Sequence, residues 1–428
     1  MNGAARRLSQ FKQLLEHAHE KLALDFGFVL WDGTTVPDRL DPAGLAILIA
    51  DEGAIAGLVR RPKLDTLLNL WVSGRFDIRN GSILDLVAHR PKVRTRKIWK
   101  SVDKRLALST ALRFLLTSRG GPWPLEAIPT DRPGDGGTQR NKENVSFHYD
   151  EVPTPFYRLW LDPEMLYTCG YFTDWGNDLA TAQRDHLDIT CRKLRLKPGE
   201  TLLDIGCGWG GLACYAAEHF GVRVHGMTLS QEQLAYAKDK VARAGLADKV
   251  TLELRDFTTI DGAFDKAVAL GILEHFAVAR HRAFFQKVHQ VLKPNGLFLN
   301  QAIVRRRRPT RTNAENAAIN RYIFPGGELD NIAGTLEDLE QCNFEVRDVE
   351  GWREHYVLTT RFWHDGLAAN RAAADAIVGA EKSRLFLAYL AGFSVGFDRG
   401  SLGVYQTLAV KRERGRSGLP PTRGDVYG

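Results

Sequence analysis

Between residues 201 and 304 the sequence alternates between short apolar runs and amphipathic stretches. Runs such as TLLDIGC, VRVHGMTL and GLFLNQAIV have the length of buried β-strands. The stretch SQEQLAYAKDKVARAG has apolar residues at helical spacing, and Ser230 at its start is a predicted N-cap. Strand–helix alternation is typical of a parallel sheet covered by helices on both faces. We therefore expect a doubly wound, Rossmann-like α/β domain.

The chain has 428 residues, which predicts two folded units. Residues 1–118 show helical spacing around Phe11 and a strand–turn–strand pattern at FGFVLWDGTTV, so we expect a smaller α+β domain there. Residues 119–144 are rich in Gly, Pro, Asp and Asn and are predicted to be a linker. The α/β domain then covers residues 145–412, and the polar residues 413–428 are predicted to form a flexible tail.

A glycine-rich turn, DIGCGWG, follows the first predicted strand of the α/β domain and opens a helix. Glycines let the backbone turn sharply and approach a ligand closely. The pattern D-x-G-x-G-x-G favours S-adenosylmethionine over a nicotinamide dinucleotide, whose sites use G-x-G-x-x-G. We predict that Asp204, Gly206, Gly208 and Gly210 bind this cofactor, with Asp204 accepting hydrogen bonds from its amino acid part.

The ends of the next two predicted strands also offer residues suited to the cofactor. Thr228, Leu229 and Gln233 stand where many adenosine-binding folds place an acidic residue for the ribose, and Thr228 and Gln233 can both pair with hydroxyl groups. Asp256 and Phe257 follow the third strand, where Asp256 is expected near the adenine amino group and Phe257 near the ring face. Ordinary core packing is the alternative for Phe257.

Several motifs, taken together in order and spacing, carry a family resemblance. They are FHYD, YTCGYF, LLDIGCGWGGL, GMTLSQEQ, LEHF, IFPGGELD and the pair His355-Tyr356. Over residues 145–412 the chain resembles the cyclopropane fatty acid synthases and the mycolic acid cyclopropane synthases. The run TLLNLWVSGRFDIRNGSILDLV is similar to the lipid-engaging N-terminal domain of the phospholipid enzymes in that family.

The resemblance implies methyl transfer from S-adenosylmethionine to the cis double bond of an unsaturated acyl chain in a membrane phospholipid. Loss of a proton from the new methyl group, with bicarbonate as the base, then closes a cyclopropane ring. The intermediate is a carbocation, which water would quench, so an apolar and dry acyl site is needed. Aromatic faces stabilise cations, and Tyr171, Phe172 and Tyr322 are the candidates.

The same resemblance assigns roles to individual residues. Glu274 is expected to accept the hydroxyl of bicarbonate, Tyr356 to donate to the ion through its phenol, and the backbone of Cys169 and Ile303 to supply further contacts. Tyr167 and Thr168 are expected at the cofactor. The thiol of Cys169 itself is interpreted as a buried structural group, because no base lies near it in the sequence.

Two positions depart from the family pattern. Gln301 stands where the family usually has a histidine; it can still donate a hydrogen bond but cannot carry a proton. Either Gln301 simply keeps bicarbonate bound, or proton handling differs and the product is a methyl or methylene branch. Phe393 stands where the family commonly has a cysteine, which excludes covalent catalysis there.

Three other functions remain as alternatives. They are a lipid C-methyltransferase on the same scaffold, a small-molecule methyltransferase, and a catalytically inactive lipid-binding protein. The Gly-rich turn and Glu274 argue against an inactive lipid-binding protein. Glu274 and Tyr356 argue against a small-molecule methyltransferase.

The charge and hydropathy of the sequence give expectations about the binding partner and the cellular location of the protein. The net charge is +7, with basic clusters at residues 90–105 and 305–311, which attract anionic lipid or are simply solvated. No nucleic-acid-binding module is recognised. The polar start and the lack of an apolar run of about 20 residues predict a cytoplasmic protein, peripheral at the inner membrane face. The resemblance further implies a homodimer.

Metal binding is not expected from the sequence. The five cysteines form no CxxC pair and fit a reducing compartment. His148, His275 and His355 lack the spacing of zinc ligands.

Overall fold

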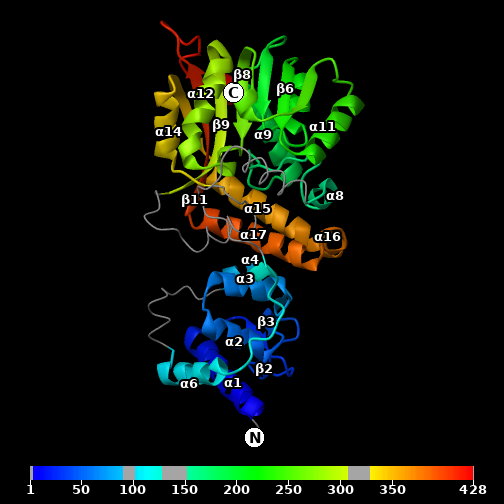
Figure 1. Ribbon diagram of the computed structural model, residues 1–428, viewed down its shortest axis with the longest axis vertical. Coiled ribbons are helices and arrows are strands. Elements are labelled where there is room, and N and C mark those ends of the chain that lie inside the picture. The colour runs from blue at the N-terminus through cyan, green and yellow to red at the C-terminus, as the bar shows by residue number, and fades with distance from the viewer. Residues whose placement is uncertain (1–2, 90–101, 128–151, 307–327, 428) are drawn as a thin grey trace. The chain divides into compact units, whose positions relative to one another are not determined.

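The computed structural model describes residues 3–89, 102–127, 152–306 and 328–427 (Figure 1). The FHYD motif, most of IFPGGELD, Tyr322, His148 and most of the two basic clusters lie outside these ranges. The chain divides into two compact units. Unit 1 comprises Met1–Pro129 and Gly379–Ala391, and unit 2 comprises Thr130–Val378 and Gly392–Gly428.

Unit 1 is a small α+β unit whose four-stranded sheet has the order β2-β1-β3-β4. Strands β1 and β3 are parallel, and the other neighbours are antiparallel. The turn predicted at Asp32-Gly33 joins β1 to β2, and Gly33 has a φ of 83°. Its elements are α1 (Gly3–Leu22), β1 (Gly27–Val29), β2 (Thr35–Val36), β3 (Ala46–Ile49), α2 (Glu52–Arg60), α3 (Leu64–Val72), β4 (Phe76–Arg79), α4 (Ile83–Ala88), α6 (Lys104–Leu115) and the 3-10 turn η1 (Pro124–Ala127).

The described beginning of the predicted linker is packed rather than extended. Leu125 is buried, and its N–H donates to Oδ1 of Asn69 over 2.9 Å. The guanidinium groups of Arg75 and Arg119 lie 5.0 and 4.9 Å from the ring centre of Trp123. A Gly/Pro-rich composition predicts a break in regular structure, but an interleaved Trp and Leu can still bury apolar surface.

A C-terminal segment that the sequence assigned to the α/β domain belongs to unit 1. Arg384 pairs with Asp77 over 2.9 Å and stacks at 4.3 Å on Trp71, whose indole N–H donates to the carbonyl of Arg384 over 2.7 Å. This segment is the first part of α17 (Ala380–Asp398), and the rest of that helix belongs to unit 2. Sequence spacing alone contains no signal for such a long-range return.

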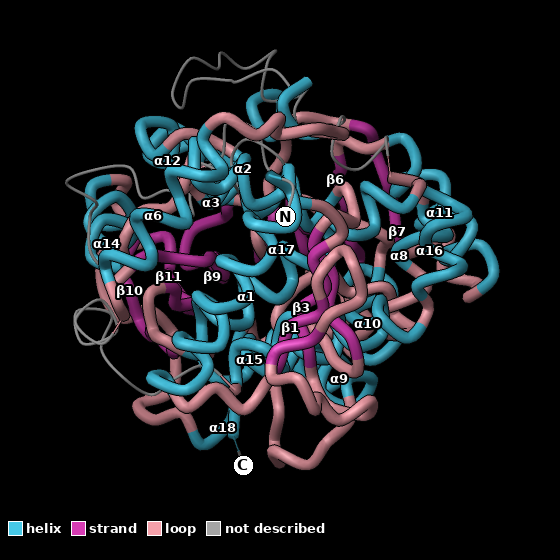
Figure 2. Tube along the Cα trace, turned by 90° about the horizontal axis from the view of Figure 1, so that it is seen from below, coloured by secondary structure: helices cyan, strands magenta, loops and turns pink. Residues whose placement is uncertain are grey.

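Unit 2 is the expected doubly wound α/β domain, with a seven-stranded sheet of order β10-β11-β9-β8-β5-β6-β7. Strands β5 to β9 are parallel to one another, and β11 runs antiparallel to both β9 and β10. Figure 2 shows β10, β11 and β9 side by side. Its strands are β5 (Thr201–Ile205), β6 (Arg223–Thr228), β7 (Val250–Leu254), β8 (Phe264–Leu270), β9 (Leu292–Arg305), β10 (Phe344–Gly351) and β11 (Leu402–Lys411). Its helical elements are α8 (Thr154–Tyr157), α9 (Leu179–Lys193), α10 (Gly211–His219), α11 (Gln231–Arg243), η2 (Phe257–Thr259), η3 (Leu273–His275), η4 (Val278–Arg280), α12 (His281–Val291), α14 (Ile332–Gln341), α15 (Arg353–Ala369), α16 (Arg371–Val378) and α18 (Gly424–Tyr427).

Two apolar cores lie on the two faces of this sheet. Because side chains alternate along a strand, Leu202 belongs to one core and Leu203 to the other. Helices α9, α10 and α11 bury their apolar residues in the first core, whereas α12 and α14 bury theirs in the second. The predicted cap of α11 is confirmed, since Oγ of Ser230 accepts the N–H of Gln233 over 3.1 Å.

The last residues, predicted to be a loose tail, fold back on unit 2. Asp425 pairs with Arg195 over 2.6 Å, Arg423 pairs with Asp348 over 2.6 Å, and Val426 is buried. The polar composition suggested a solvated end, but its charges have fixed partners on other elements. Within the described ranges, no helix has the length and hydropathy to span a membrane.

Candidate functional site

The turn that follows β5 is built on glycine. Gly206, Gly208 and Gly210 have φ angles of 78°, 53° and 81°, a region that side chains with a Cβ rarely adopt. A Cβ added to Gly206 would lie 2.1 Å from Cδ1 of Ile272. Gly210 is the N-cap residue of α10. The backbone therefore requires the glycine pattern that the sequence shows.

A pocket opens at the carboxyl ends of β5, β6, β7 and β8, where this turn lies. Every residue predicted to bind the cofactor lines it except Gly210: Tyr167, Thr168, Asp204, Gly206, Gly208, Thr228, Leu229, Gln233, Asp256 and Phe257. The sequence analysis missed further lining residues, among them Met165, Trp209, Ile272, His275 and Arg280. Trp209, His275 and Ile272 lie within or next to motifs that were recognised, whereas nothing in the spacing marked Arg280.

Asp204 is the buried acid of the pocket. Its side chain is 3% exposed, and its Oδ2 has no hydrogen-bond partner. Burial raises the pKa of this carboxyl to about 7. A cationic group such as an ammonium would supply the missing donor and would favour the ionised carboxylate.

Thr228 and Gln233, both predicted for ribose hydroxyls, are bonded to each other, with Oγ1 of Thr228 donating to Oε1 of Gln233 over 2.7 Å. The Gln233 amide nitrogen is not used in that bond. Asp256 caps η2 by accepting the N–H of Thr258 over 2.9 Å through Oδ1. Phe257 lines the pocket and also packs on Phe276 at 5.4 Å, so its two predicted roles coexist.

Glu274, the predicted catalytic carboxylate, lies in η3 directly after β8. Its Oε1 accepts the backbone N–H of Ile303 over 2.5 Å, and its buried Oε2 has no hydrogen-bond partner. Burial raises the pKa of Glu274 to about 7. The structure thus brings Glu274 and Ile303 together as expected, but the N–H of Ile303 is bonded to Glu274 itself.

Gln301 is fixed at both ends of its amide. Its Nε2 donates to Oγ1 of Thr168 over 2.6 Å, and its Oε1 accepts from Nε2 of Gln406 over 3.0 Å. Gln406 lies opposite Gln301 on β11 and accepts in turn from Nζ of Lys193 over 2.8 Å. Lys193 is paired with Glu350, and Tyr427 of α18 donates to Glu350 over 2.9 Å.

This buried polar chain therefore runs from Thr168 in the pocket to the C-terminal helix. Burial lowers the pKa of Lys193, and its pairing with Glu350 opposes that shift. Gln301, which stands where the family resemblance predicts a histidine, is a link in this hydrogen-bond network.

Aromatic residues form two groups in this region. Tyr171 and Phe172 stack on His355, with ring centres 5.0 and 6.2 Å away, and neither lines the pocket. In the second group, Tyr167 lines the pocket and packs on Trp363 at 5.1 Å. Trp363 packs on Tyr356 at 5.9 Å, and Tyr356 stacks on Phe397 at 4.5 Å. Tyr167 and Trp363 thus join Tyr356 to the pocket. Tyr171 and Phe172 do not line this pocket, and Tyr322 lies outside the described residues, so their expected role beside a cation stays a prediction.

The remaining residues singled out from the sequence are Cys169, His275, His355 and Phe393. Cys169 is fully buried, its Sγ lies 3.8 Å from the carbonyl of Trp352, and burial raises the pKa of its thiol well above the ordinary value. A structural role fits these facts. Burial lowers the pKa of His275 to about 4, and Nδ1 of His355 accepts the N–H of Phe172 over 2.9 Å. Phe393 is buried.

Comparison with known proteins identifies the family. The model of the mycolic acid cyclopropane synthetase family matches residues 137–407. The chain belongs to this family. A probable fatty acid methyltransferase of Pseudomonas putida is 33% identical over 425 residues, which covers 98% of this chain and 100% of that protein. Cyclopropane mycolic acid synthase 1 of Mycobacterium tuberculosis is 33% identical over 278 residues, 63% of this chain and 96% of that protein.

Solved structures show the same fold. The cyclopropane synthase MmaA2 from Mycobacterium tuberculosis matches with a TM-score of 0.61 and 31% identity over 63% of this chain and 98% of its own. The mycolic acid cyclopropane synthase CmaA1, complexed with SAH and CTAB, matches with a TM-score of 0.60 and 33% identity over 63% of this chain and 98% of its own. This chain is therefore an S-adenosylmethionine-dependent methyltransferase of the mycolic acid cyclopropane synthetase family.

The glycine turn gives the first prediction. Gly206→Ala should weaken S-adenosylmethionine binding by at least about tenfold, because its Cβ would collide with Ile272 and displace the turn. Gly199→Ala is the matched control: Gly199 has a similar φ of 85°, but nothing lies within 4 Å of an added Cβ. Calorimetric titration measures both affinities. An equal loss in the two variants would mean that backbone strain, not the clash with Ile272, causes the effect.

Proposed function

We propose that this enzyme transfers the methyl group of S-adenosylmethionine to the cis double bond of an unsaturated acyl chain in a membrane phospholipid, and that deprotonation then closes a cyclopropane ring. The observation that carries the proposal is the pair of buried carboxyl groups, Asp204 on the cofactor side and Glu274 beyond it, each with one unbonded oxygen. The sulfonium of the bound cofactor supplies an electrophilic methyl group. Family membership and the names of the relatives support a lipid acceptor.

Different residues of this chain have different roles in the proposed reaction. Asp204 and the glycine turn hold and orient the methyl donor. Tyr167 and Trp363 offer aromatic faces near a developing positive charge, worth about 0.5–2 kcal/mol each depending on desolvation. Glu274 is the one titratable group of the predicted catalytic set with a pKa near neutrality, so it is suited to hold or accept a proton.

Bicarbonate fits part of this site. The unbonded Oε2 of Glu274 can accept the hydroxyl of the ion, and Tyr356 can donate through its phenol. The N–H of Ile303 is bonded to Glu274, so Ile303 contributes to the ion only through Glu274 in this arrangement. Bicarbonate, if it binds, would supply a base close to the acyl chain.

A methyl-branched product is the second candidate. The observation that favours it is Gln301, whose amide is bonded at both ends and cannot take up a proton. The first of the relatives above is likewise named a fatty acid methyltransferase and not a cyclopropane synthase.

Isotope retention separates the two products. The enzyme is given S-adenosylmethionine with a fully deuterated methyl group and vesicles of a cis-unsaturated phospholipid, and the product is weighed by mass spectrometry. Ring closure should leave two deuterium atoms in the acyl chain, because one leaves as a deuteron. A methyl-branched alkene, formed when the proton leaves a neighbouring chain carbon instead, would keep all three, and the absence of any lipid mass gain would exclude both products.

The role of Glu274 gives a pH prediction. Turnover should rise as pH increases through about 7, because the group must be ionised to accept a proton and burial raises its pKa to that value. Glu274→Gln should lower kcat by at least about a hundredfold, remove this rise, and leave cofactor affinity nearly intact. Because burial holds this pKa above the value of about 4.5 expected in the unfolded chain, the wild-type protein should also lose stability as the pH rises from about 4.5 to about 7. Glu274→Gln should reduce this loss without abolishing it, since burial raises the pKa of Asp204 in the same way.

Glu253→Gln is a suitable control, since that carboxylate is exposed and pairs only on the surface with His225 and Arg255. A parallel fall of cofactor affinity and turnover in Glu274→Gln would contradict the assigned role.

We further propose that α6 docks unit 1 on an anionic membrane surface. This helix buries Thr110 and Phe114, yet Leu108, Leu112 and Leu115 lie exposed at a spacing that places them on one face. Leu116 at its end is 95% exposed. The exposed basic residues Lys104 and Arg105 precede this stripe. Leucines flanked by basic residues are typical of helices that lie in a bilayer interface.

Vesicle binding tests the docking face. Leu108→Asn with Leu112→Asn should weaken binding to vesicles of cis-unsaturated phosphatidylglycerol by about tenfold or more, because less apolar surface enters the interface. Leu67→Asn, another exposed leucine of unit 1 at 44%, is the control and should bind normally. Turnover on detergent-dispersed lipid should be unchanged, which separates docking from catalysis. Unaltered vesicle binding, or an altered oligomeric state, would refute the docking role.

A further inference from the structure

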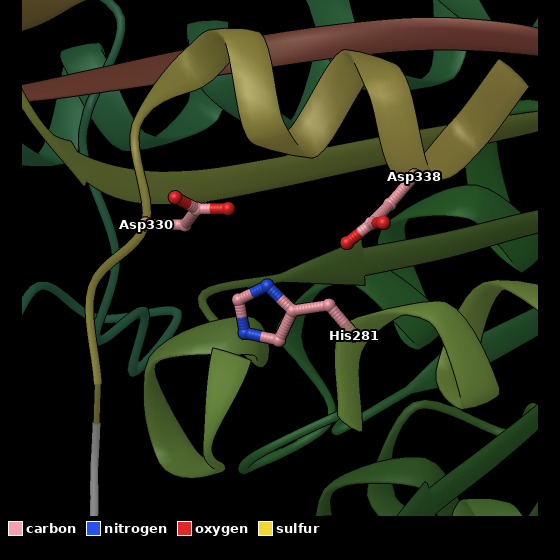
Figure 3. A group of neighbouring side chains, drawn as sticks. All are labelled: His281, Asp330 and Asp338. Atoms are coloured by element: carbon pink, nitrogen blue, oxygen red, sulfur yellow. The ribbon is translucent and has the colours of Figure 1, made fainter. Parts of the chain in front are cut away.

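Three side chains of unit 2 that the proposed reaction does not use converge beside β9. His281 is the first residue of α12, Asp330 precedes α14, and Asp338 lies within α14. One ligand atom from each lies within 4.8 Å of the others, and Figure 3 shows the two carboxyl groups and the imidazole facing a common space. His281 and Asp330 are 2% and 6% exposed.

The backbone carbonyl of Leu273 determines which nitrogen of the neutral His281 ring carries the proton. Its Nε2 lies 3.2 Å from the carbonyl oxygen of Leu273, which can only accept a hydrogen bond. Nε2 therefore carries the proton, and Nδ1 of the neutral ring presents a lone pair. Nδ1 is buried, has no hydrogen-bond partner and points toward the space between Asp330 and Asp338 (Figure 3).

Nδ1 of His281 is therefore a buried acceptor for which no described residue supplies a donor. A lone pair that faces two carboxyl groups in a buried region is unfavourable unless a cation lies between them. Arg282 pairs with Asp338, but it donates from Nε and Nη2 to a single oxygen, Oδ1. The Arg282 contact leaves the other oxygen of Asp338 for a different partner.

We propose that His281, Asp330 and Asp338 bind a divalent transition-metal ion. One imidazole nitrogen and two carboxylate oxygens suit Zn²⁺, Mn²⁺ or Co²⁺, whereas Ca²⁺ prefers oxygen ligands alone. The hydrogen bond from Nε2 to a backbone carbonyl is the usual outer partner of a metal-binding histidine, since it sets the tautomer and orients the ring. Three protein ligands leave one or more positions for water.

The role of this ion would be structural. It would join the start of α12 to α14 and to the segment after β9. Through the carbonyl of Leu273 it would also hold the turn that carries Glu274 in place. The site is independent of the proposed methyl transfer, because none of its ligands belongs to the pocket or the predicted catalytic set.

Metal titration tests the site. Full-length protein, first dialysed against a chelator, is titrated with Zn²⁺, Mn²⁺ and Co²⁺, and with Ca²⁺ as a control ion. We expect one saturable equivalent of the transition metals, a rise in Tm on binding, and no comparable effect of Ca²⁺. The Co²⁺ spectrum should lack thiolate bands, which rules out binding at the buried cysteines.

Asp330→Asn and His281→Gln should each weaken this binding by about tenfold or more, while the exposed His219→Gln should not. Circular dichroism before metal addition checks that each variant folds. If His281→Gln fails to fold, the affinity of Asp330→Asn, which keeps the size of the side chain, decides whether the metal site exists. Wild-type affinity in Asp330→Asn would overturn the proposal. The absence of stoichiometric metal binding in the wild-type protein would also overturn the proposal. It would mean that a proton alone lies between His281 and the two carboxyl groups.

Discussion

The site depends on the point where the order of the parallel strands reverses, between β5 and β8 of the sheet β10-β11-β9-β8-β5-β6-β7. From β5 the chain proceeds outward to β6 and β7, and it then returns to β8 and β9 on the other side of β5. The loops after β5 and β8 consequently diverge at one edge of the sheet and leave a crevice there. Asp204 reaches this crevice from β5 and lines the pocket, and Glu274 lies in the turn after β8, next to the lining residue His275.

Both of these carboxyl groups are buried, and burial raises their pKa values to about 7. The ionised form of each is therefore costly in the protein alone and becomes favourable only when a cation or a hydrogen-bond donor arrives. Asp204 and Glu274 are thus groups whose charge can respond to what binds beside them. The contrast with the Lys193–Glu350 pair is instructive, since those buried charges already compensate each other and serve to hold Gln406 and Gln301 in place.

The sequence was sufficient to predict whatever is decided locally. The glycine turn, the Ser230 cap and the strand–helix alternation depend on residues close together in the chain, and the structure has all three. Contacts between residues far apart in the chain could not be predicted from the sequence pattern. Nothing in the spacing indicates that Arg384 returns to Trp71, that α18 reaches Glu350, or that Trp363 packs on Tyr167. Polar or Gly-rich composition was misleading at both predicted loose segments, because single residues such as Trp123 and Val426 anchor them.

Gln301 shows how one substitution changes what the rest of a site can do. A histidine at this position could exchange a proton with a bound base, whereas the amide of Gln301 is held between Thr168 and Gln406 and has no proton to give or take up without losing a bond. In the proposed reaction, the proton from the new methyl group would then pass to Glu274 or to an ion that Glu274 holds. The pKa of Glu274 near neutrality makes that transfer energetically accessible. In the proposed reaction, the choice between a ring and a branch would thus depend on Glu274, the carboxyl group that follows β8.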